Sequence, residues 1–141
     1  RVVLDTNVWV SGQLWRGLPW KLLRLVEGGA VEPCMTAEML DELGEVLNYE
    51  RLQPRLRELG LQPVDLVSYA FDLATFFEVS PGPVIVTDDP DDDVFLRCAE
   101  IANAVYVVSG DRHLIKLKRH ASIPIVTVHE FLATEFPSEL N

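Results

Sequence analysis

The stretch PVIVTDDPDDDVFLRCAEIANAVYVVSGD (83–111) decides the fold, because it holds a helical pattern with one apolar segment before it and one after it. The segments at 83–88 and 104–110 are short, apolar and rich in β-branched residues, as buried strands are. Between them, residues 92–102 place apolar side chains at helical spacing. A strand, a helix and a second strand in this order predict one unit of a parallel sheet.

The same alternation continues outward in both directions. We expect a loop over 10–19 with no helix directly after Asp5, and further strands at 2–5, 31–35 and 123–128. The pattern predicts a three-layer α/β/α sandwich with a central, mainly parallel sheet of four or five strands. No linker rich in Gly or Ser divides the chain, so we expect a single domain over 1–141. Charged helical segments at 49–61 and 63–79 predict a helical arm at about 49–79, set to one side.

The composition is typical of a globular protein. Hydrophobic residues make up 48% and charged residues 24% of the chain, which is ordinary for a soluble domain. No apolar run approaches the ~20 residues that span a bilayer, and no signal-peptide pattern opens the chain. Cys34 and Cys98 stand in apolar contexts, so we expect both to be buried small hydrophobes in a reducing cytoplasm.

The net charge of −10 bears on the partners of the protein. A protein that binds nucleic acid through bulk electrostatics is normally basic. A nucleic-acid role for this chain therefore requires local basic groups and a cation that neutralises acidic residues. Taken alone, the acidic balance favours a small-molecule or protein partner.

Four acidic residues that are far apart in sequence stand at strand ends or helix starts. Asp5 closes VVLD and Asp111 closes VYVVSGD, while Glu42 and Asp93 each open onto a helical pattern. Carboxylates at the carboxyl ends of strands in an open α/β sheet converge on one crevice. Several carboxylates in one crevice repel each other unless a cation lies between them. These residues predict a site for Mg²⁺ or Mn²⁺, which prefer hard oxygen ligands.

Each acid also has an ordinary structural interpretation. An Asp at a strand end, such as Asp5 or Asp111, is often a turn or helix-cap residue. Glu42 shares its helix with Glu38 and Asp41, and position alone does not choose among the three. The run DDPDDD (88–93) contains five acids, whereas the favourable interaction with a helix N-terminus explains one or two.

Other catalytic signatures are missing from the sequence. The three histidines, His113, His120 and His129, lack the i, i+4 spacing of a helical zinc site. There is no Gly-rich phosphate loop and no nucleophile elbow. A phosphotransfer domain of the receiver or haloacid-dehalogenase type is the main enzymatic rival. A receiver has an acidic pair at its first strand and a Lys near its last, whereas here a single Asp5 ends the first strand and IPIVTV lacks a Lys. The phosphatase needs a second Asp two residues after the first, and Asn7 stands at that place.

A few local groups are candidates for contacts with partners. KLKRH (116–120) is the densest basic run and follows Asp111, so Lys116, Lys118 and Arg119 are the first candidates to touch a phosphate backbone. Arg16 and Lys21 are the second. We expect Trp9, Trp15 and Trp20 to pack in the core by default, with Trp15, Trp20 and FLATEF (131–136) as exposed candidates for a protein interface.

Four segments of the chain resemble the motifs of the PIN domain family of metal-dependent ribonucleases. They are LDTNVWVSG, TAEMLDELGEVL, DPDDDVFLRCAEIANA and VVSGDRHL, in the family's order, and the likeness runs the length of the chain. DPDDD together with SGD is similar to the subgroup of toxins from toxin–antitoxin systems. The resemblance selects Glu42 over Glu38 and Asp41, and it places Asp93 in the third motif.

The resemblance implies a function as well as a fold. It implies a Mg²⁺ or Mn²⁺ site held by the four acids, hydrolysis of RNA phosphodiester bonds, a homodimer and a protein antitoxin as partner. Asn7 and Ser109 would support the acids. Catalysis would use a water molecule activated by the metal, without a side-chain nucleophile.

One departure from the family pattern concerns His113. Many members carry another acid at this place, two residues after the Asp of the fourth motif. A second metal would then be held weakly, or with the help of Asp89 or Asp92. A catalytically weak PIN-like module that binds a partner or nucleic acid is the alternative function.

Overall fold

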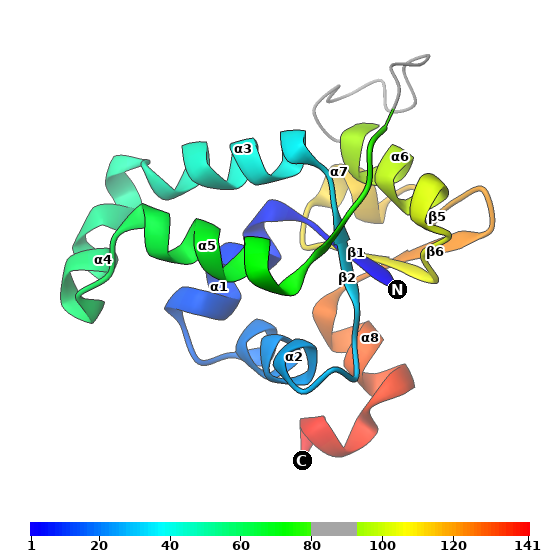
Figure 1. Ribbon diagram of the computed structural model, residues 1–141. Coiled ribbons are helices and arrows are strands. Elements are labelled where there is room, and N and C mark those ends of the chain that lie inside the picture. The colour runs from blue at the N-terminus through cyan, green and yellow to red at the C-terminus, as the bar shows by residue number, and fades with distance from the viewer. Residues whose placement is uncertain (80–92) are drawn as a thin grey trace.

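The computed structural model describes residues 1–79 and 93–141 of the chain, and these parts form a six-stranded sheet with helices on both faces (Figure 1). The strands are β1 (Val2–Leu4), β2 (Pro33–Met35), β3 (Thr75–Phe76), β4 (Tyr106–Val108), β5 (Arg119–His120) and β6 (Ile123–Val126). The α-helices are α1 (Thr6–Leu14), α2 (Leu18–Glu27), α3 (Ala37–Leu47), α4 (Gln53–Leu59), α5 (Pro63–Leu73), α6 (Asp93–Ala102), α7 (Arg112–Ile115) and α8 (Val128–Glu135). Two 3-10 helices are η1 (Glu50–Leu52) and η3 (Pro137–Leu140). The predicted α/β/α class is confirmed.

The strand order positions the site. The order is β3–β2–β1–β4–β6–β5, and neighbours run parallel except β5 and β6. β1 lies between β2 and β4, so the strands that follow it in sequence extend the sheet in opposite directions. Such a switch point leaves a crevice at the carboxyl ends of the strands, where ligands of open α/β sheets bind. Asp5 follows β1 at this edge, and Ser109 follows β4.

The helices divide between the two faces of the sheet. Figure 1 shows α6 above the strands and α2 and α8 below them. α6 contacts β1, β2 and β4 and contributes the buried Leu96 and Ala99, while the lower layer contributes Leu22, Leu23 and Leu132. Burial of each large aliphatic side chain stabilises the fold by about 1.5–3 kcal/mol relative to exposure. These two apolar layers hold the carboxyl edge of the sheet in place.

The arm predicted at about 49–79 consists of η1, α4 and α5 and lies to the left of the sheet in Figure 1. It packs on α1 and α3 through the buried Leu52, Leu56, Leu66 and Ala70. The predicted helix at 63–79 is too long, because α5 ends at Leu73. The next residues are extended, and β3 pairs with Cys34 and Met35 of β2. Thr75 and Phe76 favour a strand, and this preference outweighs the continuation of the helix.

The number of strands differs from the four or five that were predicted. β3 and β5 are two residues long, below the length at which a sequence pattern indicates a strand. β5 lies inside the basic run 116–120 and pairs antiparallel with β6. The strand predicted at 83–88 lies outside the described residues.

The predicted loop at 10–19 is wrong over its first half, because α1 begins at Thr6, directly after Asp5. The sequence suggested a loop because Gly12 looked like a break. Gly12 instead lies within α1 where the helix meets α2: an added Cβ would lie 2.4 Å from Leu23 Cδ1 and 2.9 Å from the carbonyl oxygen of Pro19. The glycine is needed for close helix packing.

This close approach predicts opposite effects for two Gly→Ala substitutions. Gly12→Ala should lower the free energy of unfolding by about 1–3 kcal/mol, because the added methyl group overpacks the α1–α2 contact. Gly44→Ala in α3 is the matched control, since its nearest neighbour, Val67 Cγ2, lies at an ordinary 3.8 Å. It should raise the free energy by about 0.5–1 kcal/mol through helix propensity. Urea unfolding measures both, and equal effects would contradict the packing argument.

The two cysteines are buried and free, as the sequence predicts. Burial raises the pKa of the Cys98 thiol to about 12 and also raises that of Cys34. Both side chains therefore behave as small core hydrophobes. Within residues 1–79 and 93–141, no helix combines the length and apolarity needed to cross a membrane.

Candidate functional site

Asp5 occupies the carboxyl end of β1 and is almost fully buried, with 4% of its surface exposed. Its Oδ1 accepts a hydrogen bond from the Val8 amide at 3.0 Å, so it is the N-cap of α1. Its Oδ2 accepts from the Ser109 hydroxyl and from the Gly110 amide. The capping interpretation is thus correct for Asp5, and it does not exclude ligand binding, because a carboxylate offers about four acceptor sites.

The environment of Asp5 is unfavourable for its charge. Burial is the main cause that raises the pKa of this carboxyl above its usual range. The hydrogen bonds from Ser109, Val8 and Gly110 oppose this rise, and the nearby negative charge of Asp111 adds to it. A buried carboxylate beside a second one is relieved by a cation, which is the condition expected at a metal-binding edge.

Asp111 stands beside Asp5 on the turn that follows β4. The Ser109 hydroxyl accepts from the Asp111 amide at 2.9 Å, so Ser109 links the two acids. Asp111 Oδ1 accepts from the His113 amide at 2.7 Å and caps the short helix α7. The side chain of Asp111 remains about one-third exposed, at 32%. Ser109 therefore lies where a supporting residue was predicted.

Glu42 is connected to the neighbour of Asp5. Its Oε2 accepts a hydrogen bond from Thr6 Oγ1 at 2.6 Å. α3 buries Met39 and Leu43 against the core, and this orientation leaves Glu38 exposed while Glu42 is half-buried. The structure therefore separates Glu42 from the other acids of its helix. Thr6 was not predicted as a site residue, although its place next to Asp5 was the available signal.

Asp93 is the first residue of α6 and is 6% exposed. Arg97 lies one turn later on the same helix, with Nη2 at 4.0 Å from Asp93 Oδ2. A buried acid is stabilised by a nearby guanidinium. Arg97 was not singled out in the sequence, since an i, i+4 pair on a helix is usually a surface feature.

The donor chemistry of the four candidate acids fits Mg²⁺ or Mn²⁺, since each offers hard carboxylate oxygens. The geometry is less complete. In the described parts of the chain, no group of three or more His, Cys, Asp and Glu side chains is arranged to hold a metal ion. The negative charge of Asp111 lies close enough to Asp5 to raise the pKa of that carboxyl, and Glu42 accepts a hydrogen bond from Thr6. Asp89 and Asp92 lie outside the described residues.

A groove of about 300 Å³ opens beside the acids. Ser109 and Gly110, which hydrogen-bond Asp5, form part of its wall. Asn7 also lines it and is exposed. The Asn7 side chain makes no hydrogen bond to a described carboxylate. Any supporting role of Asn7 would therefore be a contact with a ligand in this groove.

The predicted basic contacts fall into two groups. Lys116, Lys118 and Arg119 are exposed around the end of α7. Arg16 stacks on Trp20, with Cζ 4.9 Å from the ring centroid, and Lys21 Nζ donates to the Glu139 carbonyl oxygen at 2.7 Å. The second group thus has contacts within the protein, and the first group is the more exposed.

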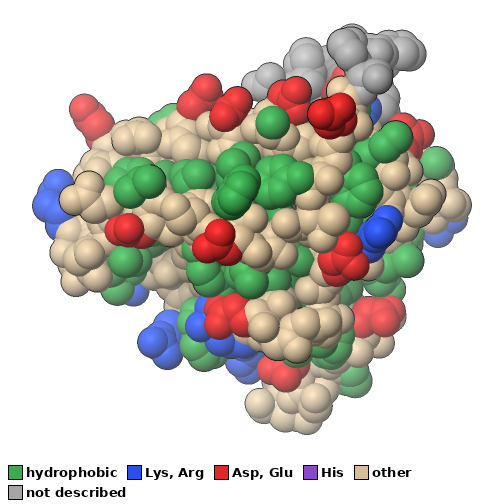
Figure 2. Space-filling view, viewed as in Figure 1, with side chains coloured by type: hydrophobic (Ala, Val, Ile, Leu, Met, Phe, Trp, Pro, Cys, Tyr) green, Lys and Arg blue, Asp and Glu red, His purple; other side chains and the backbone are tan. Residues whose placement is uncertain are grey.

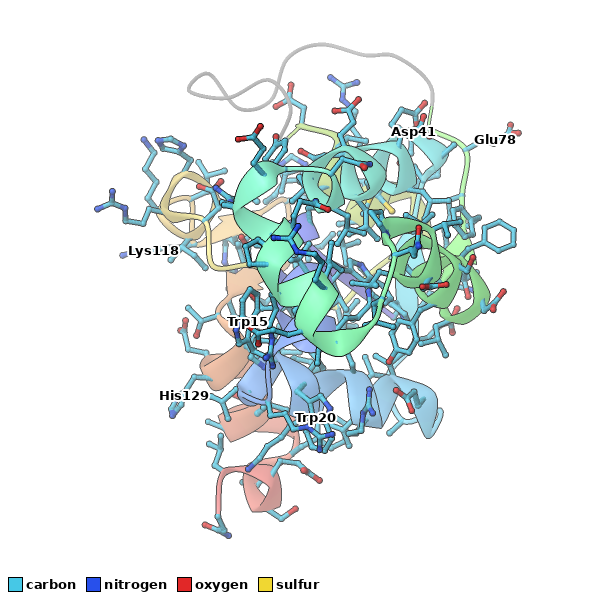
Figure 3. The ribbon with its side chains drawn as sticks, turned by 90° about the vertical axis from the view of Figure 1, so that its left-hand side faces the viewer. Trp15, Trp20, Asp41, Glu78, Lys118 and His129 are labelled. Carbon is cyan, nitrogen blue, oxygen red and sulfur yellow. The ribbon has the colours of Figure 1, made fainter. Side chains whose placement is uncertain are left out.

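Charge is distributed unevenly over the surface. Figure 2 shows acidic side chains along the edge of the molecule that carries α3. Figure 3 shows Asp41 and Glu78 on one side of the molecule and Lys118 and His129 on the other. An acidic protein can thereby offer a locally less negative surface to an anionic ligand.

The candidate interface residues differ in how exposed they are. Trp9 is fully buried, whereas Trp15 is 44% exposed and Trp20 is half-buried. The prediction of FLATEF as an exposed apolar segment is wrong, because Phe131 and Leu132 are buried. Its apolar residues follow the core-facing side of α8.

Comparison with known proteins gives one finding. A family model described as PIN domain matches residues 1–113, which include β1 to β4 and all four candidate acids. No curated protein matches the chain.

Proposed function

The chain belongs to the PIN domain family, and on this premise we propose that it is a metal-dependent endoribonuclease that hydrolyses RNA phosphodiester bonds. The family gives the chain a nuclease-type fold. The observation that carries the proposal is the buried carboxylate of Asp5, held beside Asp111 at the switch point of the sheet. Among the described contacts, neither carboxylate has a Lys or Arg partner, and the one basic side chain near the pair is His113, whose Nδ1 lies 3.6 Å from Asp111 Oδ1.

Asp5, Glu42, Asp93 and Asp111 are the residues that would hold Mg²⁺ or Mn²⁺. When bound, the cation would stabilise charge on the phosphate and lower the pKa of the attacking water. The chain itself fixes the ligands. Ser109 and the Gly110 amide orient Asp5, and the Thr6 hydroxyl orients Glu42. Partners of this kind commonly change metal affinity or activity by about 10–100-fold.

The finer biological role is also a proposal. We propose a cytoplasmic toxin that acts as a homodimer and is neutralised by a protein antitoxin, as the resemblance of its motifs implies. The free buried thiols of Cys34 and Cys98 are compatible with a reducing compartment. For the protein interface, the exposed Val64 and Phe71 on α5 replace FLATEF as candidates, together with Trp15.

The test of function is cleavage of end-labelled single-stranded RNA in Mn²⁺, in Mg²⁺ and in EDTA, with Asp93→Asn as the inactive control. Internal cleavage that requires the metal and the carboxylate is expected. RNA binding without cleavage would instead favour the catalytically weak binding module, for which His113 in place of an acid is the supporting observation. Metal-dependent cleavage by Asp93→Asn at the rate of the parent would contradict the proposal.

The basic groups near α7 give a quantitative prediction. Replacing Lys116, Lys118 and Arg119 together by Ala should raise the RNA concentration needed for half-maximal cleavage. Each lost phosphate contact should also make the logarithmic salt dependence shallower by about 0.7. Metal affinity should stay nearly unchanged. Fluorescence anisotropy over a salt series measures the effect.

The control removes cations from the helical arm formed by η1, α4 and α5. Arg51 and Arg57 are exposed around η1 and α4, and their replacement by Ala should leave the salt slope as in the parent. If the triple variant kept the parent slope as well, the basic run would be a solvated face only.

A further inference from the structure

The groove beside Asp5 has a lining that the acids do not explain. It lies at the carboxyl ends of β1, β4 and β6, where α1, α2 and α8 begin. Its walls carry both apolar side chains, among them Leu18, Pro19 and Val128, and polar ones, among them Asn7, Ser11 and His129. At about 300 Å³ it lies at the lower end of the range of ligand pockets, about 300–1,000 Å³. It therefore suits one small ring system.

Its chemistry argues against a phosphate group as the occupant. Among the described residues, no Lys or Arg lines the groove. The helix starts that border it are also poor anion sites. At the start of α1, the Asp5 carboxylate already accepts from the Val8 amide. Pro19 has no amide proton to offer at the start of α2, and the Thr127 side chain already accepts from the Glu130 amide at the start of α8.

The same lining suits an unpaired nucleobase. A base has two apolar faces, which pack on aliphatic side chains, and a polar edge, which needs a few donors and acceptors. Leu18, Pro19 and Val128 supply the aliphatic surface. Asn7 and His129 supply polar groups that are exposed and can reach a base edge.

The position of the groove connects it with the proposed cleavage site. Ser109 and Gly110 form its wall on one side and hydrogen-bond Asp5 on the other. A nucleotide in the groove would therefore be close in sequence to the phosphate at the acids. Lys118 projects on the same side of the molecule as His129 (Figure 3), where the RNA backbone would leave the groove.

We propose that this groove binds one unpaired base of the RNA next to the scissile phosphate, so that cleavage depends on the base at one position of the substrate. The inference rests on the proposed ribonuclease function. A base within a duplex cannot enter the groove, because its edge is paired and its faces are stacked. Base-paired RNA of the same sequence is thus a poor substrate.

The experiment is an abasic scan. Single-stranded RNA oligonucleotides with one abasic residue at each position around the cleavage site are compared by kcat/KM. One position should show a loss of about 5- to 150-fold, as expected for removal of a stacked base. Equal rates at all positions would overturn the inference while the ribonuclease function stood.

Variants assign the effect to the groove. In Leu18→Ala and in His129→Ala the abasic penalty should shrink, because the base has already lost part of its contact. Leu25→Ala is the matched control, a half-buried leucine on the same helix outside the groove. It should keep the full penalty. An unchanged penalty in both groove variants would also overturn the inference. His129 is exposed, so its variant folds even where Leu18→Ala is unstable.

The two failures remain distinguishable. If the protein cleaves no RNA, the proposed function fails. The same scan, read as binding by fluorescence anisotropy, still decides whether one base position is held by the groove.

Discussion

The Glu42→Gln variant is expected to cleave single-stranded RNA at least about 100 times more slowly than the parent protein. Loss of a residue that positions a metal ligand already lowers metal affinity or activity by about 10–100-fold, and loss of a ligand should do more. Gln keeps the size of the side chain and its hydrogen bond from Thr6, which is 2.6 Å long in the parent. The fold is therefore retained, and kcat/KM in Mn²⁺ measures the loss.

Glu38→Gln is the matched control for this prediction. Glu38 lies one turn earlier on α3 and is exposed, with no contact to the first turn of α1 among the described hydrogen bonds. It removes the same charge from the same helix. Equal losses in the two variants would mean that the acidic helix face acts only through its total charge, and Glu42 would lose its assigned role.

The Asp5→Asn variant should also lose at least about 100-fold in activity. Its stability relative to the parent should instead increase as the pH rises. In the folded protein the pKa of Asp5 is raised, chiefly by burial. The folded state therefore binds the proton of Asp5 more tightly than the unfolded state does. Ionisation of Asp5 lowers the stability of the parent as the pH rises through this raised pKa.

Asn cannot ionise, so the variant is spared this loss. The free energy of unfolding of Asp5→Asn, minus that of the parent, should increase as the pH rises from about 3 to 7 in chelator. At low pH the difference reflects only the altered hydrogen bonds to Val8, Ser109 and Gly110. Urea unfolding over a pH series measures it. A difference that falls with pH would show that a favourable partner holds the carboxylate ionised.

The sequence predicted the elements whose signals are local. The buried strands β1 and β4 are apolar runs, and α3 begins at Thr36, whose hydroxyl accepts from the Met39 amide as an N-cap should. The positions of Asp5 and Asp111 after strands could be predicted for the same reason, because the end of each apolar run is visible in the sequence. The strand order, and with it the switch point at β1, was not predicted, because it depends on which distant strands pair.

The missed features depend on contacts between distant segments. Gly12 looked like a break in the helix, because nothing in the sequence shows that Leu23 packs against it. β3 is two residues long and is a strand only because β2 lies beside it. Thr6 became a site residue only when the fold brought Glu42 to it, and Arg97 became one because the fold buries Asp93, one turn earlier on the same helix.

The groove at the start of α8 was beyond the reach of the sequence for the same reason. Its lining comes from four separate parts of the chain, at Asn7, Leu18, Ser109 and His129. None of these residues carries a motif for base recognition. Their shared place at the carboxyl edge of the sheet is a property of the strand order alone.

The central claim is that the acids at this edge bind a divalent cation, and a crystal soaked in Mn²⁺ tests it most directly. An anomalous difference map should show a peak at the carboxyl ends of β1 and β4, within coordination distance of the carboxylates of Asp5 and Asp93. The Asp93→Asn crystal, treated in the same way, should show a weaker peak or none. A parent map without a peak at this edge, at a Mn²⁺ concentration that supports cleavage, would contradict the account.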